Sequence, residues 1–452
     1  MVEFVEKKIL KYTGELNIPN GLVLLLLFLG LFAILSTLAP NGALSVALSL
    51  ILVSSPVWFP LTLVVVFWKL WIEYVRREYI HKQEHVLLEV LLPKEIMKSP
   101  KAMESVFTGL HQGPGENTFI QRNWQGRVRP WFSFELVSIE GRVHFYVWTR
   151  KFFQKYVEAQ MYGQYPGIEV HEVKDYTRDV HFDPERMSLW GCDFILTKDD
   201  PYPIKTYVDY GLDEKAKEEE KVDPFASVLE ALGSIGKGEQ IWIQILIRTN
   251  KDKRTKEGSW FETEERWKSE AKDEIKEIRA RSLGEARNAV GEAAGEEASK
   301  SYSFLSLSKV DEETITALER SVTKNGFDAG IRGIYVTERN RFDPMHITTL
   351  TSAFKQFGAA GNLNGFRPTR WLAGYDYPWQ DFNNILQNRD RRRIIDAYRR
   401  RSWFHPPYKT KHYILNTEEL ATIYHFPGQV AKTPTLARIA STRGEAPPNL
   451  PI

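Results

Sequence analysis

The feature that most constrains this chain is an uncharged stretch near its start. No Asp, Glu, Lys or Arg occurs in the 53 residues from 16 to 68. The stretch contains two apolar runs, 21–38 and 43–68, and a helix needs ~20 apolar residues to cross a bilayer. A Pro-Asn-Gly sequence at 40–42 is typical of a turn, because Pro fixes φ and both Asn and Gly tolerate positive φ. The sequence therefore predicts a membrane anchor at 1–84, with two transmembrane helices in a hairpin.

Basic residues flank the uncharged stretch on both sides. They are Lys7, Lys8 and Lys11 before it, and Lys69, Arg76, Arg77 and Lys82 after it. Because positive residues stay on the cytoplasmic side of a membrane, we expect both termini in the cytoplasm. A cleaved signal peptide is the alternative, with a basic start at 7–11 and a cleavage zone at 36–43, but the second run would still anchor the chain. An aromatic belt is expected at the membrane boundaries, made of Trp58, Phe59, Phe67, Trp68, Trp71 and Tyr74.

The composition of the whole chain is that of a globular protein. Its 452 residues are 43% hydrophobic and 26% charged, which suits two or three domains of ~150 residues and excludes a disordered or collagenous chain. The 60 basic and 58 acidic residues leave a net charge of +2, so any charged surface must be local. The single cysteine, Cys192, excludes an internal disulfide and a zinc site of several cysteines, and fits a reducing compartment.

Short alternating runs and helical stretches at 85–180 predict a first folded unit. Strands are expected at 85–92, 130–138, 143–149 and 168–173, and helices at 99–111 and 151–162. The order strand-helix-strand-strand-helix-strand is the split β-α-β of a ferredoxin-like sandwich.

The pattern repeats at 181–380, which predicts a second α+β unit. Strands are expected at 187–197, 240–249 and 330–337, helices at 223–232 and 343–357, and the closing strand at either 367–372 or 413–416. A charged insertion at 250–300 holds 12 basic and 13 acidic residues without a wide apolar stripe. Spacings such as Glu264 to Lys268 predict a solvated helical insertion, with a partner-docking arm as the functional alternative. The fold class expected is α+β, with tandem ferredoxin-like units after the membrane hairpin.

Two short motifs resemble catalytic signatures but lack the context that the chemistry needs. HKQEH at 81–85 has the H-x-x-E-H spacing of a zinc peptidase helix, yet it falls between a membrane helix and a strand. The glycine segment 233–238 lacks the spacer and the Ser or Thr of a phosphate loop, and it precedes a strand instead of a helix. We find no catalytic constellation, so we expect no enzyme activity, no metal and no cofactor.

Charge of one sign is concentrated in a basic helical segment, 381–425. Seven arginines occur there within 13 residues. They are Arg389, Arg391, Arg392, Arg393, Arg399, Arg400 and Arg401, opposed by Asp390 and Asp396. On a helix, positions 389, 393 and 400 share a face. Aromatic groups that could stack on bases follow at once: Trp403, Phe404, His405 and Tyr408. Such a patch can hold phosphate backbones of nucleic acid without sequence preference. Contact with anionic lipid and structural or intersubunit pairing remain open alternatives.

Several stretches together resemble a known family. They are EVLLPKEIMKSPKAMESVF, YVEAQMYGQYPGIEVHEV, GEQIWIQILIR, DRRRIIDAYRRRSWF and YILNTEELATIYHFP, followed by a tail that ends APPNLPI. In this order they resemble the non-ATPase N-terminal region of prokaryotic membrane-anchored ATPases of the conjugative transfer and type IV secretion type, relatives of the DNA-pumping FtsK and HerA families. In that family the counterpart of 415–452 leads into a nucleotide-binding domain. Here it ends in a Pro-rich linker tail, 426–452, so no ATPase residue carries over.

The residues and the resemblance predict a non-enzymatic anchor or assembly module in the inner membrane of a prokaryote. It would serve a type IV secretion or conjugation-like machine that translocates DNA or protein. Expected partners are membrane lipid, a separate translocation ATPase or further copies of the chain in a homo-oligomer, and nucleic acid bound without sequence specificity. The alternative is a membrane scaffold or interaction protein with no role in translocation.

Overall fold

The computed structural model describes residues 43–93, 96, 98–112, 118–213, 223–255, 263–290, 308–359, 361–370, 377 and 379–428. The chain divides into two compact units. The helical unit comprises Met1–Ile80, Thr118–Arg127 and Leu372–Gln387, and the sheet unit comprises His81–Asn117, Val128–Trp371 and Asn388–Ile452. Both units are therefore discontinuous in sequence.

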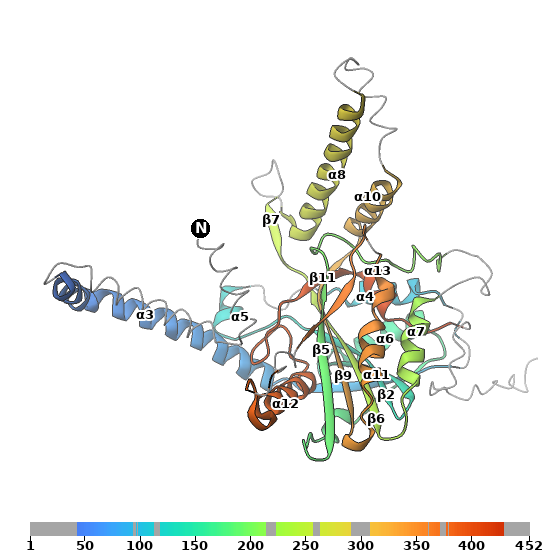
Figure 1. The fold of residues 1–452 in the computed structure, drawn as a ribbon, viewed down its shortest axis with the longest axis horizontal. Coiled ribbons are helices and arrows are strands. Elements are labelled where there is room, and N and C mark those ends of the chain that lie inside the picture. The colour runs from blue at the N-terminus through green and yellow to red at the C-terminus, as the bar shows by residue number, and fades with distance from the viewer. Residues whose placement is uncertain are drawn as a thin grey trace, which may run out of the picture. The chain divides into compact units, whose positions relative to one another are not determined.

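The helical unit is built on α3 (Ala43–His81), which is continuous through Pro56 and Pro60 (Figure 1). By length and composition, its segment Val53–His81 could cross a membrane, and none of the most apolar window is buried. The first apolar run and the turn of the predicted hairpin lie outside the described residues.

The exposed part of α3 is apolar on every side. The neighbouring residues Val64, Val65 and Val66 point in different directions around the helix, and all three are more than half exposed, at 63%, 54% and 52%. A helix that is hydrophobic all round is typical of a buried or membrane environment.

In the part of the sheet unit that is described, nine strands form one antiparallel sheet. The order is β10-β5-β9-β6-β2-β3-β1-β4, and β11 pairs with the start of β9. The strands are β1 (His85–Leu91), β2 (Phe132–Ile139), β3 (Arg142–Arg150), β4 (Glu169–Val173), β5 (Met187–Leu196), β6 (Glu239–Thr249), β9 (Gly326–Glu338), β10 (Phe366–Arg370) and β11 (Tyr413–Asn416). The α+β class predicted from the sequence is confirmed.

The first half of the sheet has the order β4-β1-β3-β2, and every neighbouring pair is antiparallel. Helix α4 (Lys101–Leu110) lies between β1 and β2 in the chain, and α6 (Gln154–Gln164) lies between β3 and β4. A two-residue turn joins β2 to β3, with Glu140 and Gly141 at φ values of 53° and 83°. Positive φ at both positions matches the twist of a tight hairpin.

The second half repeats this arrangement in the order β10-β5-β9-β6. Helix α7 (Pro224–Gly233) precedes β6 and α11 (Pro344–Ser352) follows β9, close to the predicted helices 223–232 and 343–357, and each begins with an Asp cap and a Pro. Both candidates for the closing strand are strands. β10 pairs with β5, whereas β11 pairs with the first residues of β9, which lie outside the β5–β9 register.

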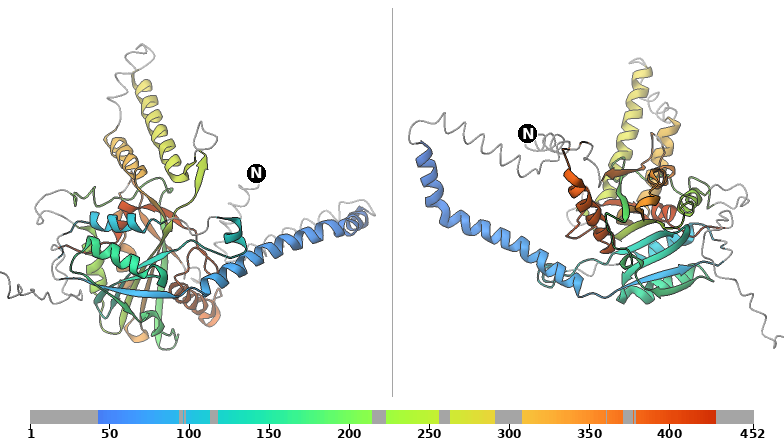
Figure 2. Two further views of the ribbon diagram at one scale, coloured as in Figure 1. Left: turned by 180° about the vertical axis from the view of Figure 1, so that it is seen from behind. Right: turned by 60° about the horizontal axis from the view of Figure 1, so that its bottom comes forward.

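The two faces of the sheet differ in chemistry. Helices α4, α6, α7 and α11 lie on one face (Figures 1 and 2), and the apolar core lies between them and the strands. There the ring of Phe107 from α4 lies 5.0 Å from that of Phe134 on β2. The neighbouring residue Glu135 points to the opposite face, where it and Gln244 are fully buried. A buried polar face must be both paired and covered, because an unpaired buried charge costs several kcal/mol.

The charged insertion between β6 and β9 is helical, as the sequence predicts, but one side of it is buried instead of solvated. After the short strands β7 (Lys253–Thr255) and β8 (Thr263–Glu265), helix α8 (Arg266–Val290) packs against α10 (Lys309–Val322) (Figure 1). Their shared apolar core consists of Ala271, Ile275, Ile278, Ile315 and Leu318. The buried side was not predicted because α10, which supplies the other half of this core, lies beyond the charged window 250–300.

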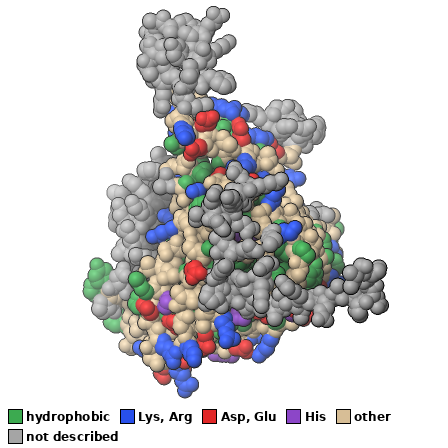
Figure 3. Space-filling view, turned by 90° about the vertical axis from the view of Figure 1, so that its right-hand side faces the viewer, with side chains coloured by type: hydrophobic (Ala, Val, Ile, Leu, Met, Phe, Trp, Pro, Cys, Tyr) green, Lys and Arg blue, Asp and Glu red, His purple; other side chains and the backbone are tan. Residues whose placement is uncertain are grey.

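The surface charges of the insertion also pair differently from the prediction. Glu264 lies on β8 and pairs with Lys272 at 2.5 Å, while Lys268 lies 3.7 Å from Glu265. The i,i+4 rule fails here because the helix starts only at Arg266. On the face of the molecule drawn in Figure 3, basic and acidic side chains are interspersed.

We expect Gly330→Ala to destabilise the sheet unit. A Cβ atom at Gly330 would lie 2.0 Å from Cε2 of the fully buried Trp403, and overpacking of this kind costs about 1–3 kcal/mol. Gly163→Ala in α6 is the matched control, because nothing lies within 4 Å of its Cβ. Urea unfolding of the full-length protein in detergent, followed by tryptophan fluorescence, should give a lower midpoint for Gly330→Ala only. Equal midpoints for the two variants would contradict this packing.

A candidate phosphate-binding surface on helix α12

Helix α12 (Ile385–Arg399) is held on the polar face of the sheet by one of its sides. The ring of Tyr398 lies 5.3 Å from that of Trp242 on β6, and its hydroxyl lies 2.8 Å from the hydroxyl of Tyr176. The buried residues of the helix are Ile394, Ile395, Ala397 and Tyr398. This spacing places them on one side, so the opposite side is fixed and faces outward.

Three of the predicted site residues lie on this outer side. The side chains of Arg389, Arg393 and Arg400 are 57%, 53% and 59% exposed. Arg389 and Arg393 lie 3.4 and 3.6 Å from Asp390, and Arg400 lies 2.8 Å from Asp396. Exposed ion pairs of this kind contribute about 0–1 kcal/mol, so a phosphate can compete for these guanidinium groups. Arg392 is also exposed.

Arg391 and Arg399 are only partly exposed and contact the protein. Arg391 donates from Nη1 to the side chain of Asn388 at 3.2 Å, and its pKa is lowered by burial and by the nearby charge of Arg339. Arg399 donates from Nε to the carbonyl oxygen of Thr177 at 3.0 Å. These two side chains are thus oriented by contacts within the protein.

Arg401 does not belong to the surface at all. Its side chain is 1% exposed and forms a fork with Glu135, donating from Nε at 2.9 Å and from Nη2 at 3.1 Å, and it also pairs with Asp175. Burial opposes its charge, but the two carboxylates hold the pKa of Arg401 well above its usual value. The predicted role of Arg401 in phosphate binding is therefore corrected to one of pairing inside the fold.

The aromatic side chains that follow the arginines are buried or partly buried. Trp403 is fully buried beneath the guanidinium group of Arg332, 5.1 Å from its ring, and Phe404 lies 4.4 Å from Arg248 in the same way. Tyr408 donates its hydroxyl to Asp396 at 2.8 Å. The predicted stacking of Trp403 and Phe404 on bases is wrong, because the polar face of the sheet uses both rings as its cover.

The arginines on that face are paired as well. Arg332 on β9 donates to Asp193 at 2.7 Å, and both side chains are at most 2% exposed. Arg248 on β6 donates to Asp328 at 2.7 Å. Sequence reasoning missed these pairs, although a charge inside an otherwise apolar strand is a signal for them.

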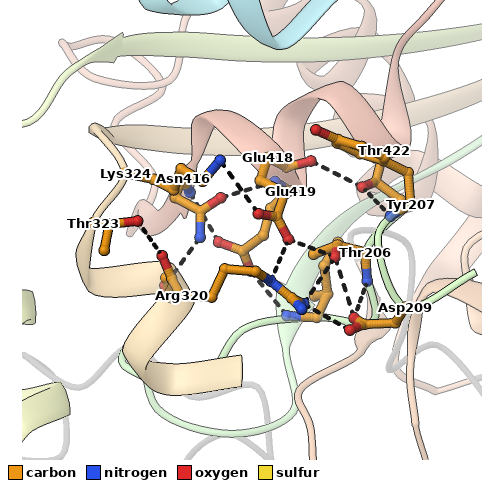
Figure 4. Close-up of polar contacts among 12 residues, drawn as sticks. Thr206, Tyr207, Asp209, Arg320, Thr323, Lys324, Asn416, Glu418, Glu419 and Thr422 are labelled. Atoms are coloured by element: carbon orange, nitrogen blue, oxygen red, sulfur yellow. Dashed lines mark hydrogen bonds and ion pairs between the residues drawn. The ribbon is translucent and has the colours of Figure 1, made fainter. Parts of the chain in front are cut away.

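A second polar cluster lies at the start of α13 (Thr417–Ile423), as Figure 4 shows. Asn416 accepts from the amide of Glu419, and Glu419 accepts from the amides of Asn416 and Ile204, each at 2.8 Å. Burial raises the pKa of Glu419 to about 8, although the two amides favour its carboxylate form. A carboxyl group that titrates near neutral pH is a candidate acid or base, so its surroundings decide its role.

The surroundings of Glu419 are a network of hydrogen bonds and ion pairs that connects separate segments of the fold. The neighbouring Glu418 accepts from Thr206 at 2.6 Å and pairs with Arg320 at 2.9 Å. Lys324, just after α10, lies 3.5 Å from Glu418 and 2.6 Å from Glu104 of α4. In the described residues, no group of His, Cys, Asp or Glu is placed to hold a metal ion. The cluster ties the insertion to α4 and α13.

The structure locates the two motifs that resemble catalytic signatures, HKQEH at 81–85 and the glycine segment 233–238. His81 ends α3, whereas His85 begins β1 and stacks on Trp148 with ring centroids 4.4 Å apart. Burial, with the charges of Arg150 and Arg401, lowers the pKa of His85 to about 4. The two imidazoles do not share a helical face. The glycine segment 233–238 leads from the end of α7 into β6.

A comparison with known protein families identifies the family of this chain. A family model described as a domain of unknown function (DUF8128) matches residues 74–438. The chain belongs to this family. The match begins in the last turns of α3 and extends through α12 and α13. The DUF8128 region therefore contains the described strands and the exposed arginines at 389–400, which we call the arginine face, but not the apolar part of α3. A search of curated proteins finds no match.

We expect Arg401→Ala to destabilise this DUF8128 protein far more than Arg400→Ala. Removing Arg401 leaves the buried carboxylate of Glu135 without its cationic partner, which costs about 3–5 kcal/mol, whereas the exposed pair of Arg400 contributes about 0–1 kcal/mol. Urea unfolding midpoints of the two full-length variants in detergent measure the difference. If the two neighbours lose the same stability, Arg401 is not the buried partner of Glu135.

Proposed function

We propose that the chain is a non-enzymatic inner-membrane anchor and assembly module of a type IV secretion or conjugation-like machine that translocates DNA or protein. In this proposal α12 binds phosphate backbones, and a separate ATPase supplies the motor. The observation that carries the proposal is the outer side of α12, whose inner side packs on the sheet: Arg389, Arg392 and Arg393 are exposed on the helix, and Arg400 is exposed directly after its last residue.

The arrangement on α12 supports binding to a phosphate backbone. Positions 389 and 400 are 11 residues apart, so their Cα atoms are separated by about 16 Å along the helix axis. That length covers about five phosphates of one strand of a duplex. Because Trp403 and Phe404 are buried, the surface relies on charge and not on stacking with unpaired bases. Duplex DNA of any sequence is therefore the preferred ligand.

The membrane part of the proposal rests on α3. A helix that is apolar on all sides and exposed over Val53–Phe67 has no favourable environment in water. Basic residues follow its apolar part, starting at Lys69, which favours a cytoplasmic position for the sheet unit. We propose that both termini are cytoplasmic, in the inner membrane of a prokaryotic cell.

We also propose that the sheet unit is a tandem of two ferredoxin-like units joined edge to edge. The support is the repeated chain order strand-helix-strand-strand-helix-strand with matching sheet orders, β4-β1-β3-β2 and β10-β5-β9-β6.

Replacing Arg389, Arg393 and Arg400 together by Ala should weaken binding to all duplex sequences alike. The slope of log affinity against log salt is roughly −0.9 for each phosphate neutralised, so the triple variant should flatten it by about 2–3. A salt titration with the full-length protein in uncharged detergent and two unrelated duplexes measures this change.

The control removes the same charge elsewhere. Replacing Lys272, Lys276 and Arg279 of α8 by Ala takes away three exposed basic groups from the insertion. Equal losses in the two triple variants, or affinity no better than millimolar at low salt, would contradict DNA binding by α12. If only binding to anionic vesicles responds to the α12 variant, the arginine face contacts lipid instead.

Affinity purification of the tagged full-length protein from native membranes should recover an ATPase of the hexameric DNA- or protein-pumping type. The expectation follows from the resemblance of the chain to the non-ATPase region of such motors. Purification of the Arg401→Ala variant serves as the control for dependence on the folded sheet unit. Recovery of other membrane proteins without any ATPase would favour the scaffold alternative.

A further inference from the structure

Helix α5 (Phe119–Asn123) belongs to the helical unit and packs against α3, although 37 residues, 82–118, separate them in the chain. The ring of Trp68 lies 6.3 Å from that of Phe119 and 6.3 Å from that of Trp124, and the ring of Trp71 lies 5.7 Å from that of Trp124. The contact is made where the apolar part of α3 ends and its charged part begins.

Backbone contacts fix the segment 118–127 in this position. The indole nitrogen of Trp71 donates to the carbonyl oxygen of Asn123 at 3.1 Å. Gly126 has a φ of 63°, and a Cβ atom there would lie 2.1 Å from the carbonyl oxygen of Val75. Only glycine allows this approach, so the segment lies directly on α3.

The segment keeps both apolar and basic groups exposed, including the two rings that contact α3. Phe119, Ile120 and Trp124 are 59%, 60% and 55% exposed, and Arg122 and Arg127 are exposed beside them. The segment contains no acidic residue. Large apolar groups together with arginine are typical of helices that lie in the interface of a membrane, where the rings reach the acyl chains and the cations reach lipid phosphates.

The depth of the contact agrees with such a position. A helix needs ~20 residues to cross the hydrocarbon core of a bilayer. The ~20 residues that precede Trp68 all belong to α3, so the helix is long enough to cross before Trp68. Trp68, Trp71 and Tyr74 would then lie at the level of the headgroups, where such side chains are enriched. Because α5 contacts two of these rings, it lies at the same level.

The third segment of the helical unit has the same character. Its large apolar side chains are also exposed, and the rings of Tyr377 and Trp379 stack at 4.6 Å. The exposed residues are Tyr377, Trp379, Phe382 and Ile385. Exposed apolar groups therefore recur in each described part of this unit.

We propose that segment 118–127 is an interfacial lipid-binding element, with Phe119, Ile120 and Trp124 inserted about 5–10 Å into the membrane that α3 crosses. Arg122 and Arg127 then face lipid phosphates. The proposal rests on the membrane anchor proposed above and adds a second membrane contact, remote in sequence, that fixes the orientation of α3 in the bilayer.

Depth-dependent quenching tests this element in the full-length protein, reconstituted into liposomes. Single cysteines that carry an environment-sensitive fluorophore are placed at Val57 in α3, at Ile120 in α5 and at Ser105 on the exposed side of α4, with buried Cys192 replaced by Ala. Val57 is 11 residues before Trp68, so it would lie near the middle of the bilayer. A second α5 label at exposed Gln125 guards against a local effect of the label at 120. The lipids carry bromine either near the headgroup or near the chain end.

The label at Ile120 should be quenched about twofold more by shallow than by deep bromine, whereas Val57 should be quenched by deep bromine and Ser105 by neither. If both α5 labels behave like Ser105 while Val57 is quenched, the interfacial element is wrong and the anchor stands. If Val57 escapes quenching as well, the membrane anchor itself fails, and the interfacial element fails with it.

Discussion

Eight residue pairs, from Phe132 opposite Ile247 to Ile139 opposite Gln240, join β2 to β6, and the rest of the sheet unit depends on this contact. Each half of the sheet would otherwise present β2 or β6 as an exposed edge with unpaired amides. The pairing makes both strands interior and aligns their side chains across the junction. On one face it joins the apolar cores of the two halves, and on the other it brings Glu135 opposite Gln244, which donates to it at 3.1 Å.

That polar face explains the course of the chain after α12. Glu135, Asp193 and Asp328 are all buried, and each needs a cation. Arg332 and Arg248 come from the sheet itself. Arg401 comes from the covering segment, residues 401–404, which lies over the polar face of the sheet. Trp403 and Phe404 then exclude water from these pairs. The covering segment therefore stabilises the fold, and it also holds α12 rigidly with its remaining arginines outward.

The arginine cluster shows how far a candidate site can be predicted. Helical spacing alone placed Arg389, Arg393 and Arg400 on one face, and the structure exposes all three. Spacing could not separate Arg400 from Arg401, its neighbour, because α12 ends at Arg399 and the chain turns at Arg401 with a φ of 47°. The turn sends one guanidinium group to solvent and the other to Glu135. The same limit applies to α8, whose apolar partner lies on another helix.

Local features of this protein were determined by the sequence itself. The apolar length of α3, the Asp-Pro starts of α7 and α11 and the alternation of the strands depend on residues near one another in the chain, so a short window contains the relevant physics. The closing strand and the roles of the charged groups were decided only by the tertiary structure. Arg401 and Glu135 are 266 residues apart, and their pairing exists only once β2, β6 and the covering segment have met. Burial is a property of that assembly, and burial determines whether an arginine is part of the core or part of a binding surface.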